Sequence, residues 1–276
     1  HIHNFNAFLY ENHDAPYCVK KQVWQCALQS ALFNGCESWL CSDLKSAERI
    51  YASCIKQLLG VRQTTCTDVA FIEAGVPGAV AEVRALQQKS RRKLRRRLNF
   101  EGTYLDNVLQ LAVQSRSPSG IILQQLTEGE PRDFFTEAFD TRKARITSSS
   151  ATKRQTYQQM NPALSVHPMY TESPAPPEIH RISFSRIRTS SHSLKIDTGR
   201  WARISREQRL CPCGEVQTEE HVLSICPCIE CSFKTTQRFL INFTRMFCCY
   251  TTTTTTTTTT VGNAYNEVIR SLKMIS

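Results

Sequence analysis

The stretch Leu44-Lys-Ser-Ala-Glu-Arg-Ile-Tyr-Ala-Ser-Cys-Ile-Lys-Gln-Leu-Leu-Gly60 decides the fold class of this chain. Its apolar side chains recur every three or four residues, the spacing that places them on one face of an α-helix. Ser42 or Asp43 is suited to cap the first turn. Gly60 follows the last apolar residue, where glycine commonly ends a helix. The pattern predicts a helix whose buried face consists of Leu44, Ala47, Tyr51, Cys54, Ile55, Leu58 and Leu59.

Three neighbouring segments show the same helical period. The first covers residues 19–32 and stops at Asn34-Gly35, and the second runs from Thr67, its expected cap, to residue 74. The third opens at Pro77 and continues to residue 98. Four helices with short connections predict a mainly α, bundle-like domain over residues 17–99. Residues 1–16 are interpreted as the end of a truncated upstream domain.

The charge balance favours an anionic partner. The chain has 276 residues, and 34 Lys and Arg against 24 Asp and Glu give a formal net charge of +10. Nucleic acid is a more natural partner for this excess than a membrane surface. No apolar run is long enough to cross a bilayer, and the N-terminal residues lack the pattern of a secretory signal. We expect an intracellular protein without membrane association and, because the sequence begins at His1, a piece of a longer chain.

The fourth predicted helix ends in six basic residues within seven positions, namely Arg91, Arg92, Lys93, Arg95, Arg96 and Arg97. Charges at this density repel one another unless an anion lies nearby. We favour phosphate contacts with nucleic acid. The alternative is a solvated helix end that leads into a linker.

The remainder of the chain is predicted to contain a connector, a linker and a basic C-terminal segment. Residues 100–147 form the connector, with candidate helices over 104–113 and 131–143. Residues 148–178 are rich in Pro and Ser and poor in large apolar residues, which is typical of a linker between domains. The tail, 232–276, contains ten consecutive threonines, for which we expect no unique packing.

A second basic cluster lies within the predicted zinc-binding segment, residues 179–231. Eight basic residues precede the first cysteine of this segment and face only Asp197 and Glu207, a local net charge of +6. We predict nucleic-acid contacts for five of them, namely Arg186, Arg188, Arg200, Arg203 and Arg206.

A metal site is predicted from the pattern Cys211-x-Cys213-x7-His221-x4-Cys226. Structural zinc takes four sulfur or nitrogen ligands in a tetrahedron. The Cys-x-Cys turn offers two thiolates, Gly214 lets the backbone fold back, and one helical turn from Thr218 would present His221. The nearby basic residues would lower the thiol pKa values and favour thiolate. We therefore predict a structural Zn²⁺ held by these four side chains.

Several alternatives to this ligand set remain open. Cys228 and Cys231 could replace one ligand, and a reduced cluster without a metal is possible. A disulfide is disfavoured in a chain without an export signal. His192, which lies among Arg and Ser, is interpreted as a surface or supporting residue. No catalytic residues are predicted, because the sequence contains no paired aspartates for nucleotidyl transfer, no phosphate-binding glycine loop and no nucleophile elbow.

Two segments resemble parts of one family, the non-LTR (LINE-type) retrotransposon reverse transcriptases. The segment 186–201, followed by Arg209-Leu-Cys-Pro-Cys-Gly and Glu220-His-Val-Leu-Ser-Ile-Cys-Pro, resembles their C-terminal zinc-binding segment. Upstream, Ala31-Leu-Phe-Asn-Gly-Cys-Glu-Ser-Trp39, Ile55-Lys-Gln-Leu-Leu-Gly-Val-Arg62 and Glu73-Ala-Gly75 resemble the helical thumb-like region that follows the polymerase domain. The order of the two matches agrees with the family.

The resemblance implies that the intact parent copies element RNA at a nicked chromosomal target. Its thumb would hold the template–primer, and its zinc segment would bind nucleic acid through a Cys-Cys-His-Cys site. The polymerase aspartates and endonuclease motifs are absent from this sequence. We therefore expect a nuclear, non-catalytic C-terminal fragment that binds RNA or DNA. The alternatives are a zinc module that binds acidic proteins and a degenerate relic of the element.

Overall fold

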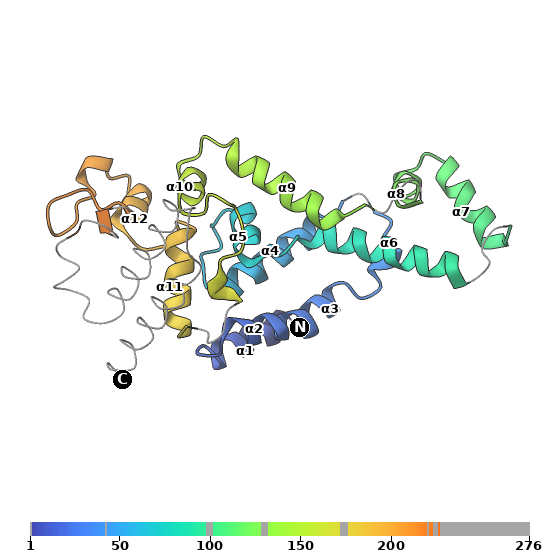
Figure 1. Cartoon of the computed structure of the whole chain (residues 1–276), viewed down its shortest axis with the longest axis horizontal. Coiled ribbons are helices and arrows are strands. Elements are labelled where there is room, and N and C mark those ends of the chain that lie inside the picture. The colour runs from blue at the N-terminus through green and yellow to red at the C-terminus, as the bar shows by residue number, and fades with distance from the viewer. Residues whose placement is uncertain are drawn as a thin grey trace, which may run out of the picture. The chain divides into compact units, whose positions relative to one another are not determined.

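The computed structural model describes residues 2–41, 43–97, 102–127, 132–171, 176–219, 221, 222 and 226. These residues are mainly helical, which confirms the predicted fold class (Figure 1). Within them, the one β pairing is an isolated antiparallel bridge between Leu210 and Val216. The chain divides into two compact units, His1–Ser193 and Leu194–Ser276.

The first unit begins with helix α1 (Ile2–Glu11). A continuous helical stretch follows, made of α2 (Tyr17–Val23), a π-helical turn (Trp24–Gln29) and α3 (Ser30–Leu32), which confirms the helix predicted over 19–32. Phe5 of α1 is buried in the same core as Trp24 and Leu28. The N-terminal residues therefore belong to this unit, and assigning 1–16 to an upstream domain is wrong.

Helices α4 (Lys45–Leu59), α5 (Thr67–Ala74) and α6 (Ala79–Arg97) carry the centre of the core. The first two end at Gly60 and Gly75, whose φ angles of +70° and +63° lie in the left-handed region that glycine tolerates best. Both predicted ends are therefore confirmed. Three starts differ from expectation. Leu44 and not Asp43 stands at the N-cap of α4, although Asp43 Oδ1 accepts the N–H of Lys45 at 2.9 Å. Thr67 is the first helical residue of α5, and α6 begins two residues after Pro77.

The residues predicted as a connector form three helices. α7 (Tyr104–Gln114) and α9 (Phe134–Thr147) match the two candidate segments, while α8 (Pro118–Thr127) was not predicted. Asp133 caps α9 by accepting hydrogen bonds from the N–H groups of Phe135 and Thr136. α9 runs beside α5 and α6, so it is part of the packed unit (Figure 1).

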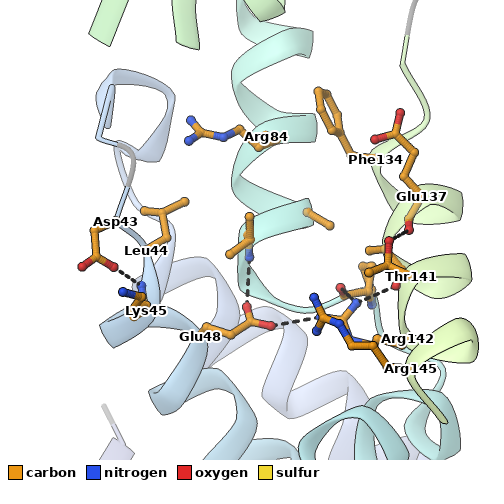
Figure 2. A pocket seen from close by; sticks show the side chains of 14 residues that line it. Asp43, Leu44, Lys45, Glu48, Arg84, Phe134, Glu137, Thr141, Arg142 and Arg145 are labelled. Atoms are coloured by element: carbon orange, nitrogen blue, oxygen red, sulfur yellow. Dashed lines mark hydrogen bonds and ion pairs between the residues drawn. The ribbon is translucent and has the colours of Figure 1, made fainter. Parts of the chain in front are cut away.

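Arg142 of α9 joins this helix to α4 and α5. It donates to Glu48 Oε1 at 3.0 Å and to the carbonyl oxygen of Pro77 at 2.6 Å, and its guanidinium lies 4.7 Å from the Phe71 ring. Glu48 Oε2 also accepts the N–H of Val80 at the start of α6. Figure 2 shows these bonds at the edge of a cavity of about 650 Å³ that is lined by α4, α6 and α9.

The predicted linker over 148–178 is wrong for the part that the structure describes. Helix α10 (Thr152–Met160) and a 3₁₀ turn (Pro168–Tyr170) lie within it. Tyr157 is fully buried against residues of α5 and α9. The prolines do not prevent packing, because they stand at the ends of elements: Pro162 follows α10, and Pro177 precedes α11 (Glu178–Arg188). The boundary between units falls after Ser193 instead.

A buried carboxylate connects these elements. Glu73 of α5 has no exposed surface and accepts Arg188 Nε at 2.8 Å and Nη2 at 3.1 Å. Its oxygens also accept the hydroxyl groups of Tyr157, at 2.9 Å, and Tyr170, at 2.8 Å. An ion pair so placed is stable because every charged atom has a partner, and removing one partner leaves the other charge buried and uncompensated.

Replacing Glu73 by Gln keeps the shape of the side chain but removes the charge opposite Arg188. We expect the free energy of unfolding of the first unit to fall by about 3–5 kcal/mol, measured by urea denaturation. The matched control is Glu137→Gln, which removes an exposed ion pair with Arg132 and should change little. Equal effects of the two substitutions would contradict the role of the Glu73 network.

His167 makes stability depend on acid. Burial, with a smaller effect from Arg188, lowers the pKa of His167 from 6.5 to about 3. Between these two pH values the unfolded chain binds a proton at His167 that the folded chain does not. The stability that the neutral imidazole contributes is therefore fully present above pH 6.5 and is lost as the pH falls toward 3. We expect His167→Asn to remove a slope of up to about 1.4 kcal/mol per pH unit from acid-unfolding curves. The exposed His3→Asn should keep that slope, and an unchanged slope in His167→Asn would refute this assignment.

Candidate metal centre

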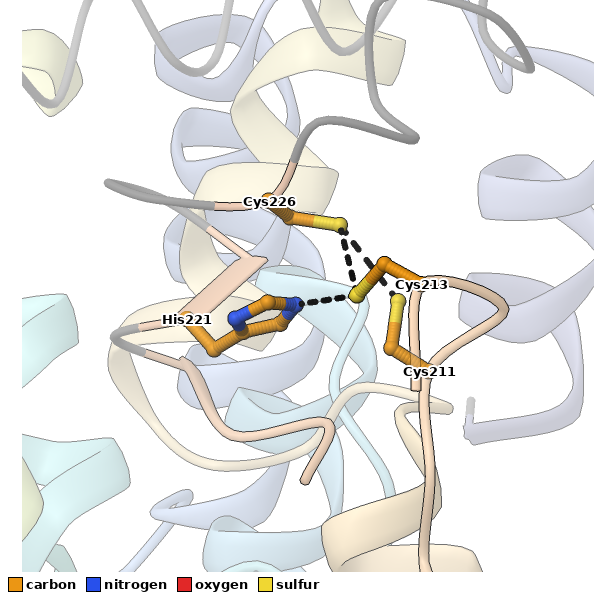
Figure 3. A group of neighbouring side chains, drawn as sticks. All are labelled: Cys211, Cys213, His221 and Cys226. Carbon is orange, nitrogen blue, oxygen red and sulfur yellow. Dashed lines mark hydrogen bonds between the residues drawn. The ribbon is translucent and has the colours of Figure 1, made fainter. Parts of the chain in front are cut away.

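A tight turn in the second unit carries the first two predicted ligands. Gly214 donates its N–H to the carbonyl oxygen of Cys211 at 2.9 Å, and the N–H of Cys211 bonds to the carbonyl oxygen of Glu215 at 2.7 Å. Pro212 occupies the second position of this turn, which suits its fixed φ. Gly214 has a φ of +94° with open space around its Cα. The short Cys-x-Cys spacing is thus accommodated, and Figure 3 shows both thiols turned toward the remaining ligands.

His221 and Cys226 approach from the following turn. The Thr218 hydroxyl accepts the N–H of His221 at 3.0 Å, and the Thr218 carbonyl oxygen accepts the N–H of Val222 at 3.0 Å. This confirms the predicted helical turn that presents the imidazole. The N–H of Cys226 bonds to the carbonyl oxygen of His221 at 2.8 Å, which fixes the fourth side chain.

The four ligand atoms lie close enough together to bind one metal ion. All lie within 4.8 Å of one another. The sulfur atoms of Cys211 and Cys226 are 3.4 Å apart, those of Cys213 and Cys226 are 3.9 Å apart, and Cys213 Sγ lies 3.1 Å from His221 Nε2. Zn–S bonds of about 2.3 Å and Zn–N bonds of about 2.0 Å correspond to tetrahedral edges of about 3.5–3.8 Å. The group can therefore hold a metal ion with little rearrangement.

Hydrogen bonding favours the ligating form of Cys211. Burial alone would raise the pKa of this thiol. Hydrogen bonds from the N–H of Cys213 and from the side chains of Cys226, His221 and Cys213 outweigh burial and lower the pKa from 9.0 to about 7. Thiolate is the form that binds metals, and it is accessible here near neutral pH.

The cysteine cluster is also where the described residues of this unit bury their apolar side chains. Among its described residues, the buried apolar side chains are Cys211, Val222 and Cys226, and Leu194 and Cys213 pack against them. The described residues of this unit alone bury too few apolar groups to offset the conformational entropy of ordering them. Small units of this kind normally obtain their folding free energy from a bound metal.

The structure separates the predicted nucleic-acid residues into exposed and structural ones. Arg188 is 6% exposed and pairs with Glu73, so it is not available to a phosphate, which corrects its predicted role. His192, also 6% exposed, is buried rather than at the surface. Arg186 is exposed and donates to the carbonyl oxygen of Gly60. Six others are exposed on α6 or in the second unit, namely Arg92, Lys93, Arg96, Arg200, Arg203 and Arg206.

Three further residues that were predicted to contact nucleic acid lie on α6. Arg91 is half-buried and donates to the carbonyl oxygen of Leu123 at 2.8 Å. The side chains of Arg95 and Arg97 lie outside the described residues, as do Cys228 and Cys231, so the proposed substitution of a zinc ligand stays open.

Comparisons with protein-family models, curated proteins and solved structures give no match to this chain. None of the described helices is long and apolar enough to cross a membrane.

Removal of one ligand should release the metal. We expect elemental analysis to find about one zinc ion per chain in a reducing preparation. The Cys213→Ser variant should lose this ion, and its second unit should unfold, because metal binding supplies folding free energy. Cys18→Ser, which alters an exposed thiol of the first unit, should retain the metal. Zinc that is absent from the unaltered chain, or retained by Cys213→Ser, would overturn the predicted site.

Proposed function

We propose that the chain is a nucleic-acid-binding fragment of a reverse transcriptase of the non-LTR retrotransposon type, without polymerase activity of its own. In this proposal, zinc stabilises the second unit, which presents basic side chains to phosphates. The first unit corresponds to the thumb-like region beside the template–primer. The observation that carries the proposal is the Cys-Cys-His-Cys group, which could hold a metal ion, within a segment rich in exposed arginine.

The placement of charge supports nucleic acid as the partner. Arg92, Lys93 and Arg96, which we term the α6 basic cluster, are exposed near the end of a 19-residue helix. None of the three forms an ion pair with a residue in the part of the chain that the structure describes. Exposed cations without acidic neighbours repel one another, and a polyanion relieves that repulsion.

The second unit contributes an equivalent surface. Arg200, Arg203 and Arg206 are exposed; of the two acidic residues near them, Asp197 is buried and Glu207 is exposed. Guanidinium groups suit phosphate because their planar donors form two parallel hydrogen bonds. This surface and the α6 basic cluster each offer three cations to phosphates. Several such contacts together give binding that is strong at low salt and weakens as salt rises.

Salt dependence tests the proposal. We expect the full chain to bind RNA and DNA oligonucleotides in mobility-shift assays, with affinity that falls steeply as salt rises. Replacing Arg92, Lys93 and Arg96 by Gln should reduce the slope of log affinity against log salt by about 0.7–0.9 for each phosphate that the variant no longer neutralises.

The matched control replaces three exposed basic residues outside the cluster, Lys45, Arg49 and Arg132, and should leave the slope nearly unchanged. Absence of binding at low salt, or binding that is indifferent to salt, would refute the proposed function. Binding of an acidic peptide with equal affinity would favour the protein-binding alternative.

A further inference from the structure

The cavity of about 650 Å³ between α4, α6 and α9 has no role in the function proposed above (Figure 2). All the residues that line it belong to the first unit, and its volume lies within the range of small-molecule sites in proteins. One face of α6 and one face of α9 border it, with residues spaced three or four positions apart. The residues of these two faces are Val80, Ala81, Arg84, Phe134, Ala138 and Thr141.

Apolar side chains form part of the wall. Figure 2 shows Leu44, from the start of α4, on one side of α6 and Phe134 of α9 on the other. Val80 of α6 is 43% exposed, and Phe134 is half-buried. A ligand with an apolar body would remove these carbon atoms from water, which favours its binding.

The three guanidinium groups that line the cavity differ in their partners. Arg142 pairs with Glu48 at 3.0 Å, and Arg145 pairs with Asp68 at 3.6 Å. Arg84 forms no ion pair with a carboxylate in the part of the chain that the structure describes. The positive charge of Arg84 is therefore the one that an anionic ligand in the cavity would neutralise.

A buried amide holds Arg84 in place. Gln87, one turn further along α6, has no exposed surface, and its Oε1 accepts Arg84 Nη1 at 2.8 Å. The Gln87 side chain donates in turn to the carbonyl oxygens of Cys36 and Trp39, at 3.0 and 2.7 Å. Arg84 Nη2 donates to the carbonyl oxygen of Cys41 at 3.0 Å. Because a guanidinium carries five N–H donors, Arg84 is oriented by these bonds and retains donors for a ligand.

Burial makes the charge of Arg84 unfavourable in the empty cavity. It lowers the pKa of the guanidinium, and the Cys41 thiol opposes this with a smaller effect. A cation that has lost part of its hydration is stabilised by an anion beside it. The same anion in water would gain less, because water screens the attraction.

Acidic residues around the cavity limit the kind of anion that fits. Asp43, Glu48 and Glu137 line it together with Arg84. Like charges placed close together cost free energy, and each further negative charge on a ligand adds to that cost. A nucleic-acid strand is therefore a poor occupant, and a ligand with one negative charge is a better one.

We propose that this cavity binds a small amphipathic carboxylate, with its apolar body against Leu44, Val80 and Phe134 and its carboxylate bound by Arg84. A guanidinium suits a carboxylate because its planar donors form two parallel hydrogen bonds. Since Gln87 already orients Arg84, binding requires little ordering of this side chain. The inference goes beyond the proposed function and depends neither on the metal nor on nucleic acid.

Calorimetric titration of the full chain with two probes tests the role of Arg84. The probes are octanoate and 1-octanol, which share an apolar chain and differ in the carboxylate. We expect Arg84→Gln to weaken octanoate binding about 10- to 100-fold and to leave 1-octanol binding unchanged. Retained 1-octanol binding shows that the cavity of the variant is intact. Arg49→Gln, which removes an exposed arginine of α4 outside the cavity, is the matched control and should bind both probes normally.

A cavity-filling variant tests the location of the site. Ala138→Leu enlarges a side chain that lines the cavity and should weaken the binding of both probes at least about 10-fold, because the ligand and the new side chain cannot occupy the same space. Ala144→Leu makes the same change at an exposed position of α9 and should bind both probes as the unaltered chain does.

The predicted result is octanoate binding that depends on Arg84 and is blocked by Ala138→Leu. Absence of octanoate binding, or octanoate binding that survives Ala138→Leu, would overturn the proposed site. Equal octanoate affinity of Arg84→Gln and the unaltered chain would refute recognition of the carboxylate. Tighter binding of octyl phosphate than of octanoate would assign the anion to a phosphate monoester and overturn the proposed ligand class.

Discussion

The carboxylate of Glu73 lies where helix α5 meets α10, α11 and the 3₁₀ turn at Pro168–Tyr170, and its two oxygens accept hydrogen bonds from Arg188, Tyr157 and Tyr170. A similar group lies nearby, because Glu178 accepts Lys20 and Arg181, and Arg181 also donates to the carbonyl oxygens of Leu58 and Leu59. Ser185 connects the two groups through Tyr170 and Arg181. Buried charges of this kind are tolerated only when all partners are present. The α4–α5 core of the first unit therefore has its buried charges satisfied only with α11 in place.

The second unit is held together by a different kind of interaction. Its described residues bury few apolar groups, and the three sulfur atoms and one imidazole nitrogen occupy the place of a core. A bound ion would connect the turn that carries Cys211 to Cys226, and so add folding free energy to the few apolar contacts of the described residues. In the same unit, Arg209 donates to the carbonyl oxygens of Ile196 and Ile204 and so holds helix α12 (Lys195–Trp201) to the turn that follows it.

The sequence alone predicted the features that depend on short-range patterns. Periodic apolar residues located α4 and α5, and Gly60 and Gly75 marked their ends, because these signals act within a few residues. The four ligands were also found from spacing, since the turn at Gly214 and the Thr218 cap are local. The predicted linker was wrong because composition does not show that Tyr157 has a buried partner at Glu73, 84 residues away in sequence. For the same reason a count of arginines could not separate buried Arg188 from exposed Arg200.

The proposed stability of the second unit depends on coordination of a metal ion, and X-ray absorption at the zinc edge tests that coordination most directly. The predicted result is a first shell of three sulfur atoms at about 2.3 Å and one nitrogen atom at about 2.0 Å from the ion. Such a shell, abolished when His221 is replaced, would identify the Cys-Cys-His-Cys group as the site. A shell of four sulfur atoms would assign a ligand to another cysteine, and a shell dominated by oxygen would contradict the site altogether.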